Sequence, residues 1–286
     1  MNKKINIIQH GIDGAGHQLH GLLSCLALHD VNNYYFDGIS FMNKPFRFDH
    51  IFDEKSYNNI KNYLIEIVNN FLKYNNQIKK EYLQFIHAHE VYNIPNNYNE
   101  NILYTLDNAY YFNKIPINEC EKKIHLENIN KCKDYFINDK LPENRLTENN
   151  IVIHLRQGDA MTTGRGNGIN DYNKKLLILI NIFTKKYKDY TYYIHTDGNC
   201  DFISNYLSKN NINFQLFFKE ENLLNVLSDF IYSKIFISGI SSLSFVCTFL
   251  GNHNLIIIPD NVKHSMPDSV IRITNYIEKY KLYLKE

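Results

Sequence analysis

The chain has 286 residues, of which 44% are apolar and 14% aromatic, so it can form two domains of about 100–150 residues, each with its own core. The formal net charge is +1, because 31 basic residues nearly balance 30 acidic ones, and this excludes a global field that would attract nucleic acid or an anionic membrane. The five cysteines are odd in number and form no CxxC pair, which favours reduced thiols over a disulfide framework or a zinc site.

The first predicted elements are a strand, a glycine loop, a helix and a second strand. "INIIQ" (5–9) is typical of a buried strand, and "LLSCLALHD" (22–30) predicts a helix that packs on it. The glycine loop "HGIDGAGHQLHG" (10–21) lies between them, and "NYYFDGISF" (33–41) predicts the second strand. The apolar run at the start is too short for a secretory signal, and no run of 18 apolar residues predicts a transmembrane helix.

Residues 54–138 have a helical pattern, which we interpret as a helical insertion in the N-terminal half. In "YNNIKNYLIEIVNNFLKY" (57–74), apolar residues recur at helical spacing. "QIKKEYLQFIHAHEVY" (77–92) and "NECEKKIHLENINKCKDYF" (118–136) predict further helices. This region could shape the side of the protein that receives an acceptor.

The Asn-rich segment "LPENRLTENN" (141–150) predicts a loop, and we place a domain boundary in it, near Asn149. An N-terminal domain (1–149) and a C-terminal domain (150–286) result.

The C-terminal domain alternates short β-rich runs with helical stretches. The expected strands are 151–155, 190–196, 214–218, 234–239 and 254–259, and the expected helices are 171–187, 200–209, 221–233, 241–250 and a terminal one at 267–286. This alternation is typical of an α/β fold with a parallel, doubly wound sheet, which binds ligands at the carboxyl ends of its strands.

The glycine loop is the first candidate for a binding site. Gly14 and Gly16 permit close backbone approach, and amides at the start of the following helix would suit an anion. A tight turn from strand to helix explains the same residues equally well. The loop matches neither the dinucleotide pattern GxGxxG nor a Walker loop.

The second candidate is "HLRQGD" (154–159), at the end of an apolar strand. Arg156 offers a planar fork that can grip a phosphate, and His154 would point to the same side of the strand. Asp159 could orient the arginine. The alternative is a structural Arg–Asp pair at the edge of the sheet.

Two further strand ends carry polar residues. Thr196 and Asp197 could accept hydrogen bonds from sugar hydroxyls or cap the next helix, and capping is the simpler explanation. Ser241 and Ser242 follow a strand and open a helix, where hydroxyls and amides form a ready phosphate site. Ordinary N-capping is again the alternative.

Two other kinds of chemistry are not supported. His87 and His89 would lie on different faces of a predicted helix, and no third ligand has suitable spacing for a metal. No GxSxG sequence exists for a nucleophilic serine.

Together, these segments resemble the fucosyltransferase superfamily, which includes α-1,2-, α-1,6- and protein O-fucosyltransferases. "GHQLHGLL" (16–23) resembles its glycine loop, and "VIHLRQGD" (152–159) resembles its H-x-R-R-G-D motif. "LSDFIYSKIFISGISSLSFVCTFLG" (227–251) resembles the segment in which an acidic residue opens a helix before a serine-rich turn, and "YYIHTDG" (192–198) resembles a strand that ends in T-D. The resemblance covers about half of the chain and excludes 54–138.

The resemblance implies a GT-B architecture, in which two Rossmann-like domains face a cleft and the C-terminal domain binds the donor. It implies an inverting glycosyltransferase that moves fucose from GDP-fucose to a glycan hydroxyl, with no metal and no cofactor besides the donor. Its partners would be a nucleotide sugar and a glycan, not nucleic acid. With no transmembrane segment expected, we predict a cytoplasmic location or one peripheral to a membrane.

The resemblance also implies roles for individual residues. Arg156 would bind the β-phosphate and help GDP to leave, His154 would lie against the nucleotide, and Asp229 would read guanine. Four others would support them: Ser241 and Ser242 at the phosphate, and Gly14 and Gly16 at the cleft.

One position departs from the family pattern, because Gln157 stands where the family has a second arginine. If that arginine contacts donor phosphate, affinity falls or the donor differs; if it supports the fold through a surface pair, little changes. The general base remains open among Asp13, Asp159 and His17. Alternative functions are transfer from another nucleotide sugar, or non-catalytic binding of a nucleotide or glycan.

Overall fold

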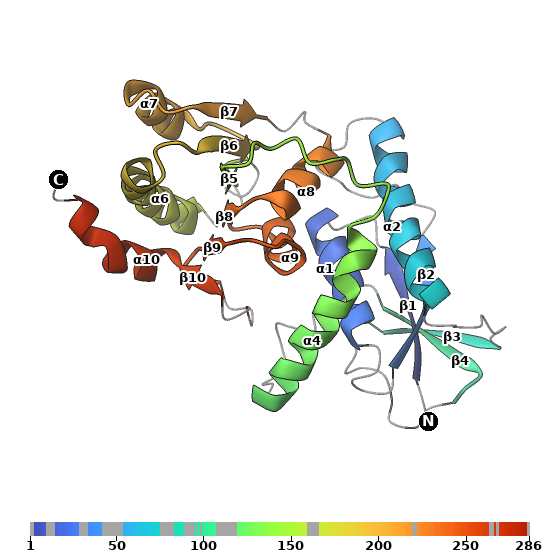
Figure 1. Ribbon diagram of the computed structural model, residues 1–286. Helices are drawn as coiled ribbons and strands as arrows, with labels where there is room; N and C mark the ends of the chain where they lie inside the picture. The colour runs from blue at the N-terminus through green and yellow to red at the C-terminus, as the bar shows by residue number, and fades with distance from the viewer. Residues whose placement is uncertain are drawn as a thin grey trace. The chain divides into compact units, whose positions relative to one another are not determined.

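The computed structural model describes residues 3–9, 15–28, 34–41, 54–74, 83–88, 95, 97, 99–106, 119–158, 166–218, 222–262, 266 and 269–284. The chain forms two compact units, Met1–Pro142 and Glu143–Glu286 (Figure 1). The boundary between them lies inside the segment "LPENRLTENN".

The N-terminal unit contains a parallel sheet with the strand order β2-β1-β4-β3. Its strands are β1 (Lys3–Gln9), β2 (Tyr34–Phe41), β3 (Gln84–Ala88) and β4 (Ile102–Leu106). The first two strands confirm the sequence prediction.

The helix predicted at 77–92 is wrong, because residues 84–88 form β3. β3 pairs in parallel with β4 (Ile102–Leu106), and the sequence analysis did not predict β4. Pairing with a distant strand overrides local helical spacing here. The region 54–138 is therefore not a purely helical insertion, since it supplies half of the first sheet.

The described helices of this unit are α1 (Ala15–Leu28), α2 (Glu54–Tyr74) and α4 (Glu119–Phe136). The apolar stripe predicted for α2 is buried, which confirms that helix. Side chains connect the three helices: the Tyr63 hydroxyl donates to the carbonyl of Phe136 at 2.8 Å, and the Asn128 amide donates to the carbonyl of Ala27 at 3.1 Å. Because α1 begins at Ala15, the predicted glycine loop is shorter than expected, and Gly16 is helical.

The C-terminal unit contains a parallel sheet with the order β10-β9-β8-β5-β6-β7. Its strands are β5 (Asn150–Leu155), β6 (Thr191–Thr196), β7 (Phe214–Phe217), β8 (Ile235–Ile237), β9 (Leu255–Ile258) and β10 (Val270–Arg272). This confirms the predicted α/β class with a Rossmann-like parallel sheet. The terminal segment is a correction: it is not one helix but β10, then α10 (Ile273–Tyr280) and a short 3-10 helix, η2 (Lys281–Leu284).

Helices cover both faces of this sheet (Figure 1). On one face, α6 (Gly166–Lys186), α7 (Asp201–Lys209) and α10 pack on alternate strand residues such as Ile151 and Ile153. On the other face lie α8 (Leu223–Tyr232) and α9 (Ser242–Leu250). Because strand residues alternate between faces, His154 points toward α8 and α9.

The strand order has a topological switch point between β5 and β8. From β5 the chain moves through α6 to β6 and then β7, whereas β8, β9 and β10 continue outward on the opposite side of β5. The carboxyl ends of β5 and β8 therefore border the crevice in which open α/β sheets bind their ligands.

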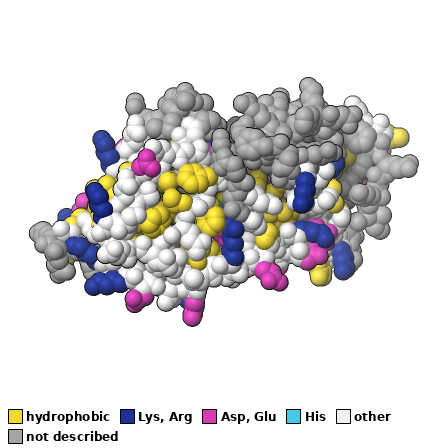
Figure 2. Space-filling model, turned by 90° about the horizontal axis from the view of Figure 1, so that it is seen from above, with side chains coloured by type: hydrophobic (Ala, Val, Ile, Leu, Met, Phe, Trp, Pro, Cys, Tyr) yellow, Lys and Arg dark blue, Asp and Glu magenta, His cyan; other side chains and the backbone are white. Residues whose placement is uncertain are grey.

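The described surface is mixed in character. On the face shown in Figure 2, basic and acidic side chains are scattered among apolar and uncharged ones. None of the described helices combines the length and apolar character that crossing a bilayer requires.

Candidate functional site

Three loops meet closely at the carboxyl ends of β5, β6 and β8, and glycines make this possible. A Cβ atom on Gly239, after β8, would lie 2.5 Å from the carbonyl oxygen of His154 in β5. A Cβ atom on Gly198, after β6, would lie 2.8 Å from the Cβ of Gln157. Neither position has room for a side chain, so the backbone between β8 and α9 lies directly against β5.

Arg156 follows β5 and pairs with Asp197, which follows β6. Arg156 Nη1 lies 2.9 Å from Asp197 Oδ2, and 19% of the arginine side chain is exposed against 7% of the aspartate side chain. Asp197 is therefore a charge partner of the arginine, while the prediction that Asp159 orients it stays a prediction, because Asp159 lies outside the described residues. The guanidinium is held by a charge partner but is not fully buried.

Asp197 also fixes the backbone that follows β5. Its Oδ1 accepts hydrogen bonds from the amides of Gln157 at 2.5 Å and Gly158 at 2.8 Å. Burial alone would raise the pKa of Asp197, but these amide hydrogen bonds and the charge of Arg156 outweigh it and hold the pKa below its ordinary value. The carboxylate is therefore ionised at neutral pH.

Gln157, at the position of the family's second arginine, is bound to helix α6. Its side-chain amide donates to Asn173 Oδ1 at 2.9 Å and accepts from Asn173 Nδ2 at 3.3 Å. This reciprocal amide pair was not predicted, because nothing in the local sequence connects the two positions. It corresponds to the alternative in which this position supports the fold.

His154 is buried at the face covered by α8 and α9. Its Nδ1 forms a short hydrogen bond with the Ser244 hydroxyl, and its ring lies 5.0 Å from the ring of Phe230. These contacts give the imidazole a structural function in joining β5 to both helices. That it also lies against a nucleotide stays a prediction.

Ser241 and Ser242 form the N-terminus of α9. Ser241 is the N-cap residue, and its carbonyl accepts from the amide of Phe245 at 3.1 Å, but its hydroxyl makes no capping hydrogen bond within the described structure. Both serines are half-buried. The side-chain N-cap considered as the alternative is therefore not observed, and the phosphate-binding role stays a prediction.

Thr196 and Asp197 do not cap the next helix, so the capping prediction is wrong. The N-cap residue of α7 is Cys200, without a side-chain capping bond in the described structure, and the amide of Asp201 instead donates to Asn199 Oδ1 at 2.7 Å. The Thr196 hydroxyl is used in its own turn, where it donates to the carbonyl of Gly198 at 3.0 Å and accepts from its amide at 3.2 Å. Both side chains therefore shape the loop after β6.

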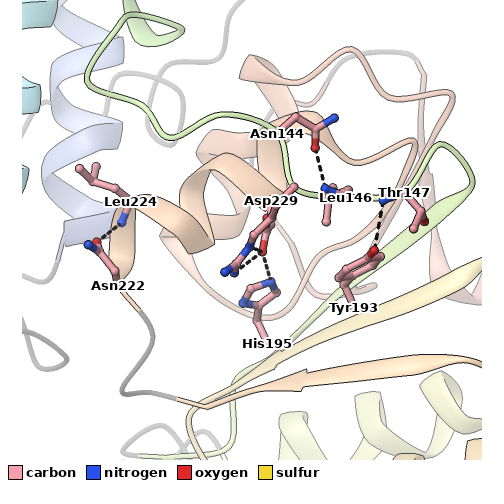
Figure 3. Close-up of polar contacts among 9 residues, drawn as sticks. Asn144, Leu146, Thr147, Tyr193, His195, Asn222, Leu224 and Asp229 are labelled. Atoms are coloured by element: carbon pink, nitrogen blue, oxygen red, sulfur yellow. Dashed lines mark hydrogen bonds and ion pairs between the residues drawn. The ribbon is translucent and has the colours of Figure 1, made fainter.

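Asp229 lies inside a buried polar network (Figure 3). Arg145 grips its carboxylate with Nε at 3.0 and 3.1 Å and Nη2 at 2.7 Å, and His195 Nε2 lies 3.0 Å from Oδ2. The Asp229 side chain is 0% exposed. The network therefore gives it a structural function, and its predicted role in reading guanine is not tested.

Electrostatics and stacking hold this network together. Burial by itself would raise the pKa of Asp229, but the hydrogen bonds and charges of His195 and Arg145 outweigh it and keep the pKa below its ordinary value. The Arg145 guanidinium carbon lies 4.4 Å from the centre of the Phe217 ring, which in turn stacks on His195 at 4.8 Å. Arg145 and His195 were missed because their partners are far away in the sequence.

The remaining predicted residues belong to the N-terminal unit. Gly16 lies in the first turn of α1 and is half-buried, while Asp13 and Gly14 lie outside the described residues, as does the side chain of His17. Across the described part of the chain, no three His, Cys, Asp or Glu side chains cluster as metal ligands would.

No family model and no curated protein matches the sequence. Among solved structures, the chain is similar to POFUT1 in complex with GDP, with 11% identity and a TM-score of 0.47, over 95% of this chain and 98% of that one. It is similar to the UDP co-structure of S. aureus MnaA, with 8% identity and a TM-score of 0.44, over 100% and 89%. Apo POFUT1 gives 12% identity and a TM-score of 0.43, over 88% and 95%. Because all three TM-scores lie below 0.5, function has to be argued from this chain's own residues.

Proposed function

We propose that the chain is a metal-independent glycosyltransferase that takes fucose from GDP-fucose and transfers it, with inversion, to a glycan hydroxyl. The observation that carries the proposal is the switch point between β5 and β8, where Arg156 follows one strand and the N-terminus of α9 follows the other. The fucose and guanine parts of the proposal come from the motif resemblance.

The chemistry of the bond explains why these groups suit the reaction. As the sugar–phosphate bond breaks, the sugar acquires oxocarbenium character and the diphosphate gains negative charge. In a transfer without a metal, the guanidinium of Arg156 and the amides at Ser242 would stabilise that charge. The Ser241 hydroxyl, which makes no capping bond in the described structure, would add a hydrogen-bond donor to the phosphate.

The ion pair between Arg156 and Asp197 is compatible with this role. The ion pair holds Nη1 toward Asp197, and 19% of the arginine side chain is still exposed, so part of it can be reached from solvent. A diphosphate would therefore bind to a guanidinium whose orientation is already restricted by the ion pair with Asp197. The general base that deprotonates the acceptor remains a choice among Asp13, Asp159 and His17.

A first experiment identifies the nucleotide by titration during thermal unfolding. GDP should raise the Tm, because a ligand specific for the folded state adds about 2.7 kcal/mol of stability at a concentration about 100 times its Kd. UDP and dTDP are the comparisons. A shift with only UDP or dTDP would mean another donor, and no shift with any of the three would refute nucleotide-sugar binding.

A second experiment measures GDP release from GDP-fucose, with water as the acceptor of the fucosyl group, in matched charge variants. Arg156→Ala should lower the rate roughly 100- to 1,000-fold, as does loss of a group that stabilises developing charge. Lys234→Ala removes one positive charge just before β8, at the amino end of that strand, and should change the rate by less than about twofold. An equal loss of rate in both variants would contradict the role of Arg156. A wild-type chain that GDP stabilises but that releases no GDP from GDP-fucose would support the non-catalytic alternative.

A further inference from the structure

One carboxylate connects the loop after β5 to the side chain that the proposed reaction depends on. Asp197 uses Oδ1 to accept from the amides of Gln157 and Gly158, and it places Oδ2 2.9 Å from Arg156 Nη1. A Cβ atom on Gly158 would lie 3.0 Å from Asp197 Oδ2, so the loop and the carboxylate are in close contact. Backbone and guanidinium are thus fixed by the same group.

A second contact fixes the same loop without involving the arginine. The amide pair between Gln157 and Asn173 joins the loop to α6. The two anchors therefore differ in one respect: only the carboxylate contacts both the loop backbone and Arg156. This difference allows the orientation of Arg156 to be separated experimentally from the stability of the loop.

Building on the proposed function, we propose that Asp197 is a positioning residue, which orients Arg156 toward the leaving diphosphate. An arginine side chain has many rotamers, and ordering it costs conformational entropy. When the structure has already ordered it, that cost is not incurred as the bond breaks, which is how preorganised groups lower a barrier. Asp197 therefore acts through Arg156 and has no need to touch the substrate.

The decisive variant is Asp197→Asn. Asparagine keeps an oxygen that can accept from the two loop amides, but it replaces the charged partner of Arg156 by a neutral group. In the wild-type background, kcat for GDP release from GDP-fucose should fall about 10- to 100-fold, with KM changed by less than about threefold, because the loss is felt mainly in the transition state.

A double-mutant cycle tests whether Asp197 acts through Arg156. In an Arg156→Ala background, Asp197→Asn should lower kcat no further, because no guanidinium remains to be oriented. Asn173→Ala is the matched control: it removes the other anchor of the loop and should leave kcat within about twofold of the wild type. Thermal unfolding of each variant establishes that it is folded.

The outcomes separate this inference from the proposed function. If Asp197→Asn lowers kcat equally in both backgrounds, or not at all, the positioning role is refuted while the transferase function stands. If Asn173→Ala lowers kcat as much as Asp197→Asn does, loop anchoring explains the effect and the inference is again refuted. A wild-type chain that neither releases GDP from GDP-fucose nor is stabilised by GDP refutes the proposed function and, with it, the positioning role.

Discussion

Replacing Arg145 should destabilise the C-terminal unit more than replacing Asp229, the residue with which it pairs. The Asp229 side chain is 0% exposed, whereas 35% of the Arg145 side chain is exposed. Arg145→Ala therefore leaves a buried carboxylate with His195 as its remaining partner in the network, and a stranded buried charge costs about 3–5 kcal/mol. The shortened side chain opens a path for water, so we expect about 3 kcal/mol, the lower end of that range.

Asp229→Ala strands no comparable charge. Arg145 can turn its guanidinium to solvent while keeping its contact with the Phe217 ring, because a third of its side chain is already exposed. The loss is then that of charge-assisted hydrogen bonds, discounted for exposure, or about 1.5–2 kcal/mol. Hydrogen exchange of amides in β5, β6 and β8 reports the free energy of unfolding of this unit in the full-length chain.

The pH dependence of stability provides a second, independent test of this prediction. A carboxyl whose pKa is lowered in the folded state contributes stability above its ordinary pKa and loses that contribution as the pH falls through the folded value. In Arg145→Ala, the hydrogen bonds and charge of Arg145 no longer lower the pKa of Asp229, so this pKa rises. The folded variant then takes up a proton at a higher pH than the wild type and recovers part of its stability. The difference in unfolding free energy between variant and wild type should therefore narrow as the pH falls through the folded-state pKa of Asp229 in the variant toward its lower value in the wild type. The reasoning would be refuted if Asp229→Ala lost more unfolding free energy than Arg145→Ala, or if the loss in Arg145→Ala did not change with pH.

Two further substitutions test the packing of the C-terminal unit. Gly239→Ala should destabilise this unit by about 1–3 kcal/mol and weaken GDP binding, because the new Cβ would lie 2.5 Å from the carbonyl oxygen of His154 in β5. Gly168→Ala is the control: its Cβ would lie 3.5 Å from the nearest atom, so the substitution should be neutral or stabilising, and urea unfolding and GDP titration compare the two variants. Lys186→Met should loosen the terminal helix by about 1 kcal/mol, since Lys186 Nζ lies 3.9 Å from the centre of the Tyr280 ring. Lys279→Met is the control, because Lys279 Nζ lies 5.4 Å from the centre of the same ring. Equal rates of proteolysis of α10 in the two variants would contradict the cation–π contribution of Lys186.

Most of the sheet of the C-terminal unit could be predicted, though not β10, because its central strands β5, β6 and β8 are buried on both faces. Runs such as "IVI" (151–153) and "LIII" (255–258) are apolar throughout, and turn residues separate them from helices, so the sequence alone indicates strands and their order along the chain. β3 gave no such signal. Phe85 and Ile86 fit a helix as well as a strand, and only the pairing with β4 decides between them.

The candidate site was predictable only in part, for the same reason. The serines at the start of α9 and the arginine after β5 stand close to strand ends, which a linear pattern reveals. The partners of Arg156 and Asp229 are not revealed in this way. Asp197 reaches Arg156 from the neighbouring strand after a whole helix has intervened, and Arg145 reaches Asp229 across 84 positions. Local spacing therefore suggested Asp159, which is close to Arg156 in the sequence, and gave no sign of Asp197.

Among the described residues of the proposed phosphate site, the positive charge of Arg156 lies against the negative charge of Asp197. Arg156 is paired with Asp197, and Gln157 adds no charge where the resemblance has a second arginine. The local charges of the pair cancel, so little long-range attraction is available for a diphosphate in solution. Oriented N–H groups remain, and they act most strongly at short range on charge that develops once water is excluded. In the proposed reaction, these residues would therefore favour the departure of the diphosphate more than its initial binding, because fixed dipoles stabilise a transition state without having to reorganise.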